Sequence, residues 1–475
     1  MALRTFGLAT CAAALTLGAG TATMAREAAA PAATPVATAA EAAHAKNVIL
    51  FIGDGMGVST VTAARIYAGQ KLGQTGEDYV LPFETFEHLA LVKTYNTNAQ
   101  VPDSAGTASA MNTGLKTRIG MLGYGPQTHN ADCRSGAGHE LPLLSEEAGQ
   151  RGLALGVVST ARITHATPAA VYARSVDRDW EADSAIPEAQ RGLGCTDIAA
   201  QLVGRPFDVA LGGGRAAFFG AAGKGQRLDA AADLPAGWVA ASGGTYVESA
   251  AALDAAPMDR PVLGLFSPSH MTYMVDRKPD SSEPTLTDMA AAAIARLQQD
   301  PDGYYLMVEG GKIDHGHHAG QAGYALEEAV EFARAVQYAI DHTDPRDTLI
   351  LVTADHSHVF TIAGYPQRGN PILGLVVSPK DDGEPGTEPA LAADGKPYTT
   401  LGYANGPGAV SGERPIPETG IAAHQQALLP LGSETHGGED VPLYAQGPGA
   451  ERVRGVMEQN LIYDVIRKAL GWPDK

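Results

Sequence analysis

Short apolar runs that alternate with amphipathic stretches constrain the fold of this chain more than any other feature. The apolar runs span residues 47–53, 153–160, 207–213, 304–310, 348–355 and 441–447, and the clearest helical patterns span 285–300 and 324–343. Apolar runs of this length are typical of strands that are buried on both faces, as in parallel sheets. We therefore predict an α/β fold, a three-layer α/β/α sandwich with a large central, mostly parallel sheet.

One region breaks this alternation. Between residues 362 and 433 the sequence shifts to Gly, Pro, Thr and Asp without clear periodicity, which predicts an inserted, loop-rich subdomain. At 475 residues with 44% apolar side chains, the chain can bury a large core as one domain or two. Its formal charge of -19 argues against a nucleic-acid binder, because such proteins neutralise phosphates with Lys and Arg. An anionic substrate would have to be attracted by local positive groups.

The N-terminal residues indicate export. Residues 1–25 combine one basic residue, Arg4, with an apolar Ala/Leu run and small residues, which is typical of a secretory signal peptide. The alternative is a membrane anchor, although the run is short and rich in Gly and Thr. Residues 26–45 are nearly all Ala, Pro and Thr, so we expect a flexible leader. We thus expect a secreted or periplasmic protein, a folded domain over 46–475, and no transmembrane segment after the signal.

The cysteine count fits the same compartment. Removal of Cys11 with the signal would leave Cys133 and Cys195, which is the number required for one disulfide in an oxidising environment. Closing a loop of about 60 residues would stabilise the fold by about 4 kcal/mol on the loop-entropy estimate. The alternative is two unpaired, buried thiols.

Acids and histidines follow several of the predicted strands. The first apolar run leads into Asp54, the fourth ends at Glu309, and the fifth leads into Asp355 and His356. In open α/β sheets the ligand crevice lies at the carboxyl ends of the strands, so these side chains should converge.

The stretch VEGGKIDHGHHAG adds further metal-capable side chains. Asp314 and His318 are four residues apart, which places both on one face if the segment is helical. Mixed carboxylate and imidazole ligands suit zinc, whereas oxygen-only sets suit magnesium. The roles of His315 and His317 remain undecided: they are either partners of the ligands or exposed side chains. The motif ETHGGEDV offers His436, which we predict to be a further ligand.

Two such metals can hold the entering and leaving oxygens of a phosphoryl transfer. A nucleophile is available in VPDSAGTASAMNTG, where Pro102 and Asp103 precede a helix of small residues that begins at Ser104. A helix N-terminus presents free N–H groups and a positive dipole end, which suits a serine that carries phosphate. The alternative is that Asp103 or Ser104 simply caps this helix.

Six motifs together resemble the alkaline phosphatase family. They are FIGDGMG, PDSAGTASA, THATPAAVYARSVDRDW, VEGGKIDHGHH, VTADHSHVF and ETHGGEDV, and they follow one another in the family's order. The resemblance implies hydrolysis of phosphate monoesters to an alcohol and inorganic phosphate through a phosphoserine, with two Zn²⁺ and one Mg²⁺ per chain.

The resemblance also implies a role for each matching residue. Ser104 would be the nucleophile, and Arg178 would hold two phosphate oxygens, although alone it would pass for a surface salt-bridge residue. The implied metal ligands are Asp314, His318 and His436 for one zinc, Asp355 and His356 for the other, Asp54 bridging to magnesium, and Thr167 and Glu309 for magnesium.

Other features resemble the animal-type branch of the family: His165 beside the magnesium ligands, the pair Cys133 and Cys195, and YANGPG in the insertion. In that branch the insertion forms a crown over a homodimer, so we expect a homodimer. That branch also binds calcium, but Ser267 stands where it has a glutamate, and we expect no Ca²⁺ here.

Three alternatives remain open. A phosphodiesterase of the same superfamily would usually lack the magnesium ligands Thr167 and Glu309. A sulfatase needs a modifiable residue in a Cys/Ser-x-Pro-x-Arg context, which DSAGTAS does not provide. The third alternative is a secreted protein that binds metal or phosphate without catalysis, although every expected catalytic residue is present.

Overall fold

The computed structural model describes residues 44–473. The predicted signal peptide and all but the last two residues of the predicted leader lie outside this range. The first described residues already belong to the fold, because Ala45 is buried and its N–H donates to the carbonyl of Ala469 at 2.7 Å. No helix within the described range is long and apolar enough to cross a bilayer.

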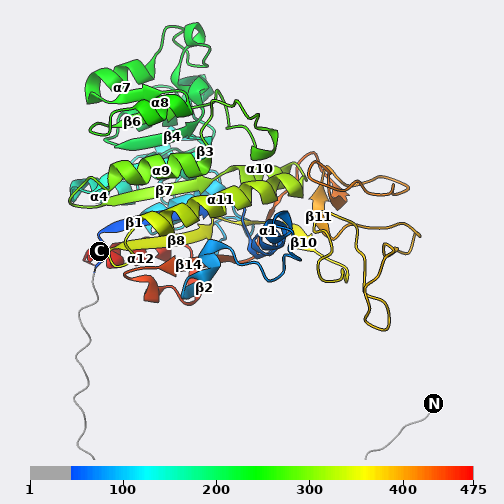
Figure 1. The fold of residues 1–475 in the computed structure, drawn as a ribbon. Coiled ribbons are helices and arrows are strands. Elements are labelled where there is room, and N and C mark those ends of the chain that lie inside the picture. Colours follow the sequence, from blue (N-terminus) through cyan, green and yellow to red (C-terminus); the bar gives the residue numbers. More distant parts are fainter. Residues whose placement is uncertain (1–43, 474–475) are drawn as a thin grey trace, which may run out of the picture. The chain divides into compact units, whose positions relative to one another are not determined.

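A sheet of ten strands forms the centre of the fold (Figure 1), in the order β15-β2-β14-β8-β1-β7-β3-β4-β6-β5. The strands are β1 (Asn47–Gly53), β2 (His88–Lys93), β3 (Ala154–Arg162), β4 (Val209–Gly213), β5 (Thr245–Val247), β6 (Val262–Leu265), β7 (Tyr304–Gly310), β8 (Thr348–Ala354), β14 (Val441–Gln446) and β15 (Gly455–Glu458). Among these described strands, β14 alone runs antiparallel to its neighbours. The prediction of a large, mostly parallel sheet is confirmed.

Helices cover the sheet in two layers. One layer holds α1 (Val58–Lys71), α9 (Leu286–Leu297) and α11 (Ala322–His342), and the other holds α2 (Ser104–Thr113), α4 (Leu144–Gln150), α5 (Ala166–Ala169) and α12 (Leu461–Ala469). Successive residues of β7 point to opposite layers, as the strand period of two requires. The hydroxyl of Tyr305 donates to Asn112 of α2, whereas Leu306 packs with Leu297 of α9 over Gly156. The predicted three-layer arrangement is therefore confirmed.

The six predicted strands correspond to β1, β3, β4, β7, β8 and β14. The other four strands of the central sheet, β2, β5, β6 and β15, were not predicted. Two of these, β15 and β5, are the edge strands of the sheet, and β5 has three residues. In β2 the side chains alternate between buried and exposed, so the strand lacks the continuous apolar run on which the prediction relied.

The predicted insertion contains a second, smaller sheet. Its strands are β10 (Phe360–Ile362), β11 (Leu401–Gly406) and β12 (Gln426–Pro430), in that order. In Figure 1 the labels β10 and β11 mark this region, and it lies beside α1. The boundaries 362–433 remain a prediction, and the first strand of the small sheet begins two residues earlier.

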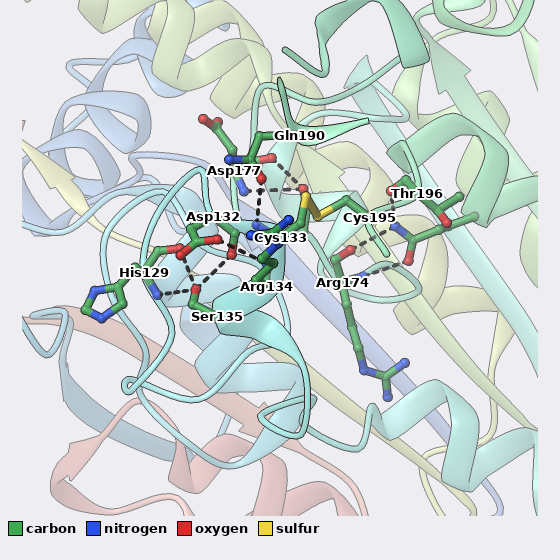
Figure 2. The surroundings of a disulfide bond; sticks show 12 residues. His129, Asp132, Cys133, Arg134, Ser135, Arg174, Asp177, Gln190, Cys195 and Thr196 are labelled. Atoms are coloured by element: carbon green, nitrogen blue, oxygen red, sulfur yellow. Dashed lines mark hydrogen bonds between the residues drawn. A yellow bond between two sulfur atoms is a disulfide. The ribbon is translucent and has the colours of Figure 1, made fainter. Parts of the chain in front are cut away.

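A disulfide joins Cys133 to Cys195 (Figure 2), as predicted. Cys133 begins the short helix α3 (Cys133–Gly136), and it packs in a small apolar cluster with Val176, Trp180 and Ile186. The bond therefore connects two segments on either side of the loop that carries Arg178. That loop is also held by main-chain bonds, from the N–H of Arg178 to the carbonyl of Gly120 and from Ile198 to Trp180.

Candidate metal centre

Three adjacent parallel strands bring their carboxyl ends to one place. In the register of the sheet, Gly53 of β1 lies beside Gly310 of β7 and Ala354 of β8. The next residues after β1 and β8 are Asp54 and Asp355, and Glu309 lies one position before the end of β7. All three acids are fully buried. The expected convergence at the carboxyl edge therefore occurs.

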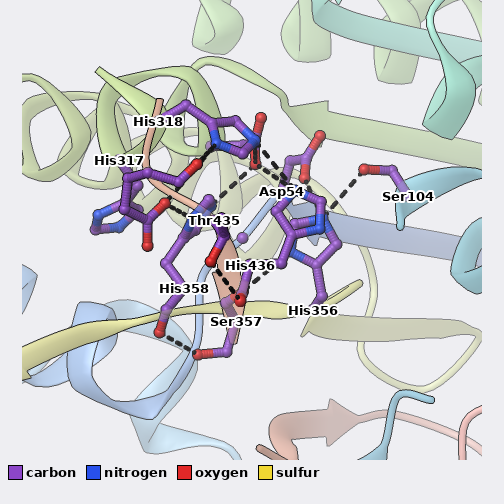
Figure 3. A network of polar contacts seen from close by, with 12 residues as sticks. Asp54, Ser104, His317, His318, His356, Ser357, His358, Thr435 and His436 are labelled. Carbon is purple, nitrogen blue, oxygen red and sulfur yellow. Dashed lines mark hydrogen bonds and ion pairs between the residues drawn. The ribbon is translucent and has the colours of Figure 1, made fainter. Parts of the chain in front are cut away.

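The segment after β7 is the helix α10 (Lys312–His318), so the condition for Asp314 and His318 to share one face is met. Nε2 of His318 lies 3.2 Å from Oδ1 of Asp314. Nε2 of His436, on β13 (His436–Gly437), lies 3.1 Å from Nε2 of His318 and 3.4 Å from Oδ1 of Asp314 (Figure 3). In a tetrahedral zinc site with bonds of 2.0–2.1 Å, ligand atoms are about 3.3–3.4 Å apart. These three donor atoms therefore fit a single zinc ion.

In three histidines of these groups, one ring nitrogen bonds to the main chain and the other faces the neighbouring donor atoms. Their Nδ1–H groups donate to main-chain carbonyls: His318 to Glu434 at 2.6 Å, His436 to Pro102 at 2.8 Å and His356 to Ser357 at 3.2 Å. This tautomer leaves the lone pair of each Nε2 available. A metal-binding histidine normally has this arrangement, with its other ring nitrogen held by a carbonyl or a carboxylate.

A second group lies around His356. Its Nε2 is 3.3 Å from Oδ1 of Asp54 and 3.4 Å from Oδ2 of Asp355, and these three residues form one of the possible metal-binding groups. The other oxygen of Asp355 accepts the N–H groups of Gly55 and His356. The His356 ring stacks on the His436 ring with 3.6 Å between the centroids, so the two groups are adjacent.

A third group consists of oxygens. Both carboxylate oxygens of Asp54, Oε1 of Glu309 and Oγ1 of Thr167 are buried and have no hydrogen-bond partner among residues 44–473. Burial and the charges of neighbouring carboxylates raise the pKa of Asp54 well above its usual range, and burial raises the pKa of Glu309 to about 7. A bound cation would remove both penalties, and an oxygen-only donor set suits magnesium.

His358 has a different role, which the sequence analysis did not assign. Its Nε2 lies 2.9 Å from Oδ1 of Asp314, and its Nδ1 lies 2.6 Å from Oε2 of the buried Glu434. Burial lowers the pKa of His358, but the bonds to the two carboxylates outweigh burial and raise it to about 9. Through these contacts His358 orients Asp314, and it also forms a further possible metal-binding group with Asp314 and His318. No sequence pattern indicated this role, because the pairing of His358 with His436 on neighbouring strands is visible only in the structure.

The serine and arginine lie next to the metal-binding groups. Oγ of Ser104 is 3.1 Å from Nε2 of His356. Asp103 caps α2, since its Oδ1 accepts the N–H of Gly106, and the Ser104 hydroxyl is left free of this role. Arg178 donates from Nη1 to Oδ2 of Asp103 at 3.0 Å, so part of the guanidinium is in a salt bridge.

His165 lies between the arginine and the oxygen donors. Its Nε2 is 3.0 Å from Nη2 of Arg178, while its Nδ1 is buried without a hydrogen-bond partner among the described residues. A donor atom of His165 lies within 4.8 Å of donor atoms of Asp54 and Glu309. It is thus close enough to compete as a metal ligand as well as to support the site.

His315 and His317 of α10, whose roles the sequence did not decide, lie in different surroundings. The His315 ring packs against His270, with 4.1 Å between centroids, and both rings adjoin His165. His317 is fully buried, and both of its ring nitrogens have partners, so the interpretation of His317 as exposed is wrong. At the position of the calcium-branch glutamate, the Ser267 hydroxyl donates to the carbonyl of His270. The absence of calcium remains a prediction.

Comparison with known proteins gives consistent results. Residues 45–472 match the alkaline phosphatase family. The chain is 47% identical over 444 residues to the tissue-nonspecific alkaline phosphatase of Gallus gallus. This alignment covers 88% of the chain and 83% of the relative. It is 43% identical over 452 residues to the corresponding isozyme of Homo sapiens, and this alignment covers 90% of the chain and 83% of the relative.

Solved structures show the same fold. The alkaline phosphatase of the Antarctic bacterium TAB5 superimposes with a TM-score of 0.63 at 23% identity, covering 91% of this chain and 100% of that one. The enzyme of Thermus thermophilus gives a TM-score of 0.66 at 22% identity, covering 91% and 92%.

Proposed function

Because the chain belongs to the alkaline phosphatase family, and so to the phosphomonoester hydrolases, we propose that it works through a phosphoserine at a centre of two zinc ions and one magnesium ion. The observation that carries the proposal is the position of Ser104 against His356, between the nitrogen-rich donor groups and the arginine that could hold phosphate. The Ser104 hydroxyl would accept the phosphoryl group, the alcohol would leave, and water would then release inorganic phosphate from the serine.

The residues around Ser104 prepare this transfer. Asp103 holds Arg178 through Nη1 and caps α2 with its other oxygen, so one side chain fixes the nucleophile and the phosphate-binding group relative to each other. The remaining N–H groups of Arg178 are available for phosphate oxygens in the bidentate geometry that guanidinium allows. Such fixed geometry contributes to catalysis because little ordering remains to be done during the reaction.

The donor sets assign the metals to residues. On the spacing of their donor atoms, Asp314, His318 and His436 would hold one zinc. Asp355 and His356 would hold the second zinc, and Thr167 and Glu309 magnesium, with Asp54 shared between the second zinc and magnesium. When bound, these ions supply the positive charge that attracts phosphate, favours the ionised serine and stabilises the departing alkoxide. In a protein with a formal charge of -19, such local charge is needed to bind an anion.

We also propose that the protein is secreted or periplasmic and acts as a homodimer. Export is supported by the signal-like residues 1–25 and by the disulfide. Dimerisation is supported by apolar side chains exposed in and near the insertion, with Tyr365 at 85%, Leu428 at 79% and Ile416 at 66% exposure. Ultracentrifugation over a range of protein concentrations tests the dimer, and a monomer at all concentrations would contradict it.

The catalytic proposal is tested by comparing three substrates that carry the same aryl leaving group: a phosphate monoester, a phosphate diester and a sulfate ester. We expect efficient turnover of the monoester, a burst of phenol at high enzyme concentration, and loss of activity on chelation. Preferential turnover of the diester or the sulfate would favour the related hydrolases. Phosphate or metal binding without turnover of any ester would favour a non-catalytic protein.

A further inference from the structure

His317 connects three parts of the fold that are far apart in the sequence. Its Nε2 lies 3.0 Å from Oγ1 of Thr60 on α1, and its Nδ1 lies 2.8 Å from the hydroxyl of Tyr403 on β11. Both hydroxyls can donate or accept, so either neutral tautomer of the ring satisfies both bonds. The imidazole is fully buried, and Tyr403 is 5% exposed. A buried, fully paired ring of this kind holds its surroundings in one arrangement.

The position of His317 on α10 makes this arrangement relevant to the metal centre. The helix spans Lys312 to His318, and it carries the two donors Asp314 and His318. A helix of seven residues is not stable by itself, so its orientation depends on tertiary contacts. His317 is the residue next to His318, and its ring fixes the last turn of this helix.

A second path joins the same ring to Asp314. The His317 ring packs over the His358 ring with 4.7 Å between centroids and an interplanar angle of 32°. His358 in turn contacts Oδ1 of Asp314 at 2.9 Å. Phe360 completes the packing, with 4.9 Å to His317 and 5.2 Å to Tyr403. Movement of His317 would therefore disturb the histidine that orients Asp314.

The insertion contacts the end of α10 at a further point. The N–H of Gln425 donates to the carbonyl of Gly320 at 2.9 Å, and its side-chain oxygen accepts the N–H of Ala322 at 2.5 Å. Gln425 is 1% exposed. The segment just after α10 is thus bonded to residues of 362–433. At the end of that range, Oγ of Ser433 lies 3.4 Å from Nδ1 of His318, and Tyr403 contacts the neighbouring His317.

We propose that His317 is a positioning residue for the zinc centre, and that its bond to Tyr403 makes the insertion part of the support of that centre. The inference rests on the proposed zinc binding by Asp314 and His318. Its consequence is that a hydroxyl in the insertion, which contacts no metal donor directly, determines how tightly zinc is held. A role of the insertion in dimerisation alone would not require this bond.

The test measures zinc affinity in the purified full chain, by competition with a chromophoric chelator, for wild type, Tyr403→Phe, His317→Gln and His317→Asn. We expect Tyr403→Phe and His317→Gln to weaken zinc binding about tenfold. His317→Asn should be closer to wild type, because the asparagine amide can replace Nδ1 toward Tyr403. Saturating zinc should restore most of the lost kcat, with KM nearly unchanged.

The matched control is Tyr172→Phe. It removes another buried tyrosine hydroxyl, which donates to the carbonyl of Ile163 at 2.8 Å, and it should leave zinc affinity unchanged. Equal zinc affinity in wild type and Tyr403→Phe would overturn the inference while leaving the proposed function intact. A wild-type protein that hydrolyses monoesters but binds no zinc would overturn the zinc assignment and the inference together. If the His317 variants do not fold, the zinc affinity of Tyr403→Phe tests the inference without them.

Discussion

Oγ of Ser104 lies 3.1 Å from Nε2 of His356, the ring nitrogen that the bond from Nδ1 to Ser357 leaves free. The first residue of α2 and the second residue after β8 thus meet, although 252 positions separate them in the sequence. This contact places a hydroxyl at the edge of a metal-binding group, and it is the geometric basis for assigning the nucleophile.

Replacement of Ser104 by alanine tests that assignment. Activity on an aryl phosphate should fall by at least about a thousandfold, since the group that accepts phosphate is lost. The free energy of unfolding should change by about 1 kcal/mol or less, because one hydroxyl is removed. Ser109→Ala is the control on the same helix, since the Ser109 hydroxyl bonds to the carbonyl of Met121, outside the site. Covalent labelling of Ser104→Ala by radioactive phosphate would show that the assignment is wrong.

Removal of His436 tests the zinc assignment. His436→Ala deletes one of three donors whose mutual spacing fits zinc, so zinc affinity should fall and activity should require added zinc. In wild type, EDTA should abolish activity, and zinc should restore it better than calcium. His342→Ala, at the exposed end of α11, is the control. Activity that persists after exhaustive chelation and metal analysis would rule out a zinc mechanism.

Loss of the disulfide should affect both stability and phosphate binding. In the double variant Cys133→Ser and Cys195→Ser, the free energy of unfolding should be lower by up to about 4 kcal/mol, because the bond joins residues 62 positions apart. Because the bonded segments flank the loop of Arg178, inhibition by inorganic phosphate should also weaken. Urea unfolding and phosphate inhibition constants measure the two effects. Two titratable thiols in unfolded, unreduced wild type would contradict the bridge.

His165 should determine how magnesium is held. Its imidazole adds no negative charge beside Asp54 and Glu309, and its Nδ1 is unpaired among the described residues. We expect added magnesium to activate the purified protein and excess zinc to inhibit it by entering this site. His165→Asp should bind magnesium more tightly and lose most of that activation, whereas the neutral control His165→Asn should not. Identical magnesium dependence in wild type and His165→Asp would make His165 a bystander.

Glu146 should contribute stability that depends on pH. Burial raises the pKa of its carboxyl, but the bonds from Arg174 and the Leu143 N–H and the charge of Arg205 outweigh burial and lower it from 4.5 to about 2. A group whose pKa is lower in the folded state stabilises the fold above its unfolded pKa, and this stability is lost as the pH falls from about 4.5 toward 2.

Glu146→Gln should therefore destabilise the protein by about 1–2 kcal/mol at neutral pH, after allowance for solvent screening of a partly exposed pair. The difference from wild type should shrink as the pH is lowered below 4.5. Urea unfolding of both proteins at neutral and acidic pH measures it, with the exposed Glu388→Gln as control. A difference that stays constant with pH would show that the charge of Glu146 contributes nothing.

Much of the fold could be predicted from the sequence because it depends on local patterns. A strand that is buried on both faces must be apolar throughout, so β1, β7 and β8 were visible without any knowledge of their partners. The position of Asp54, Glu309 and Asp355 at one edge follows from the common direction of parallel strands. The spacing of Asp314 and His318 follows from the helical period. The edge strands β5 and β15 were missed because short, partly exposed strands carry little of this signal.

The sequence also identified the motifs that resemble a family, and hence most of the donors, but it could not assign roles among the histidines. In sequence, His317, His318, His356 and His358 are the same residue type in two short motifs. Only the folded chain decides that the Nδ1 of His318 meets a carbonyl, that His358 lies between two carboxylates, and that His317 lies between two hydroxyls. The physical reason is that each partner belongs to a segment distant in the chain, and the hydrogen bonds at both ring nitrogens determine whether an imidazole can bind a metal.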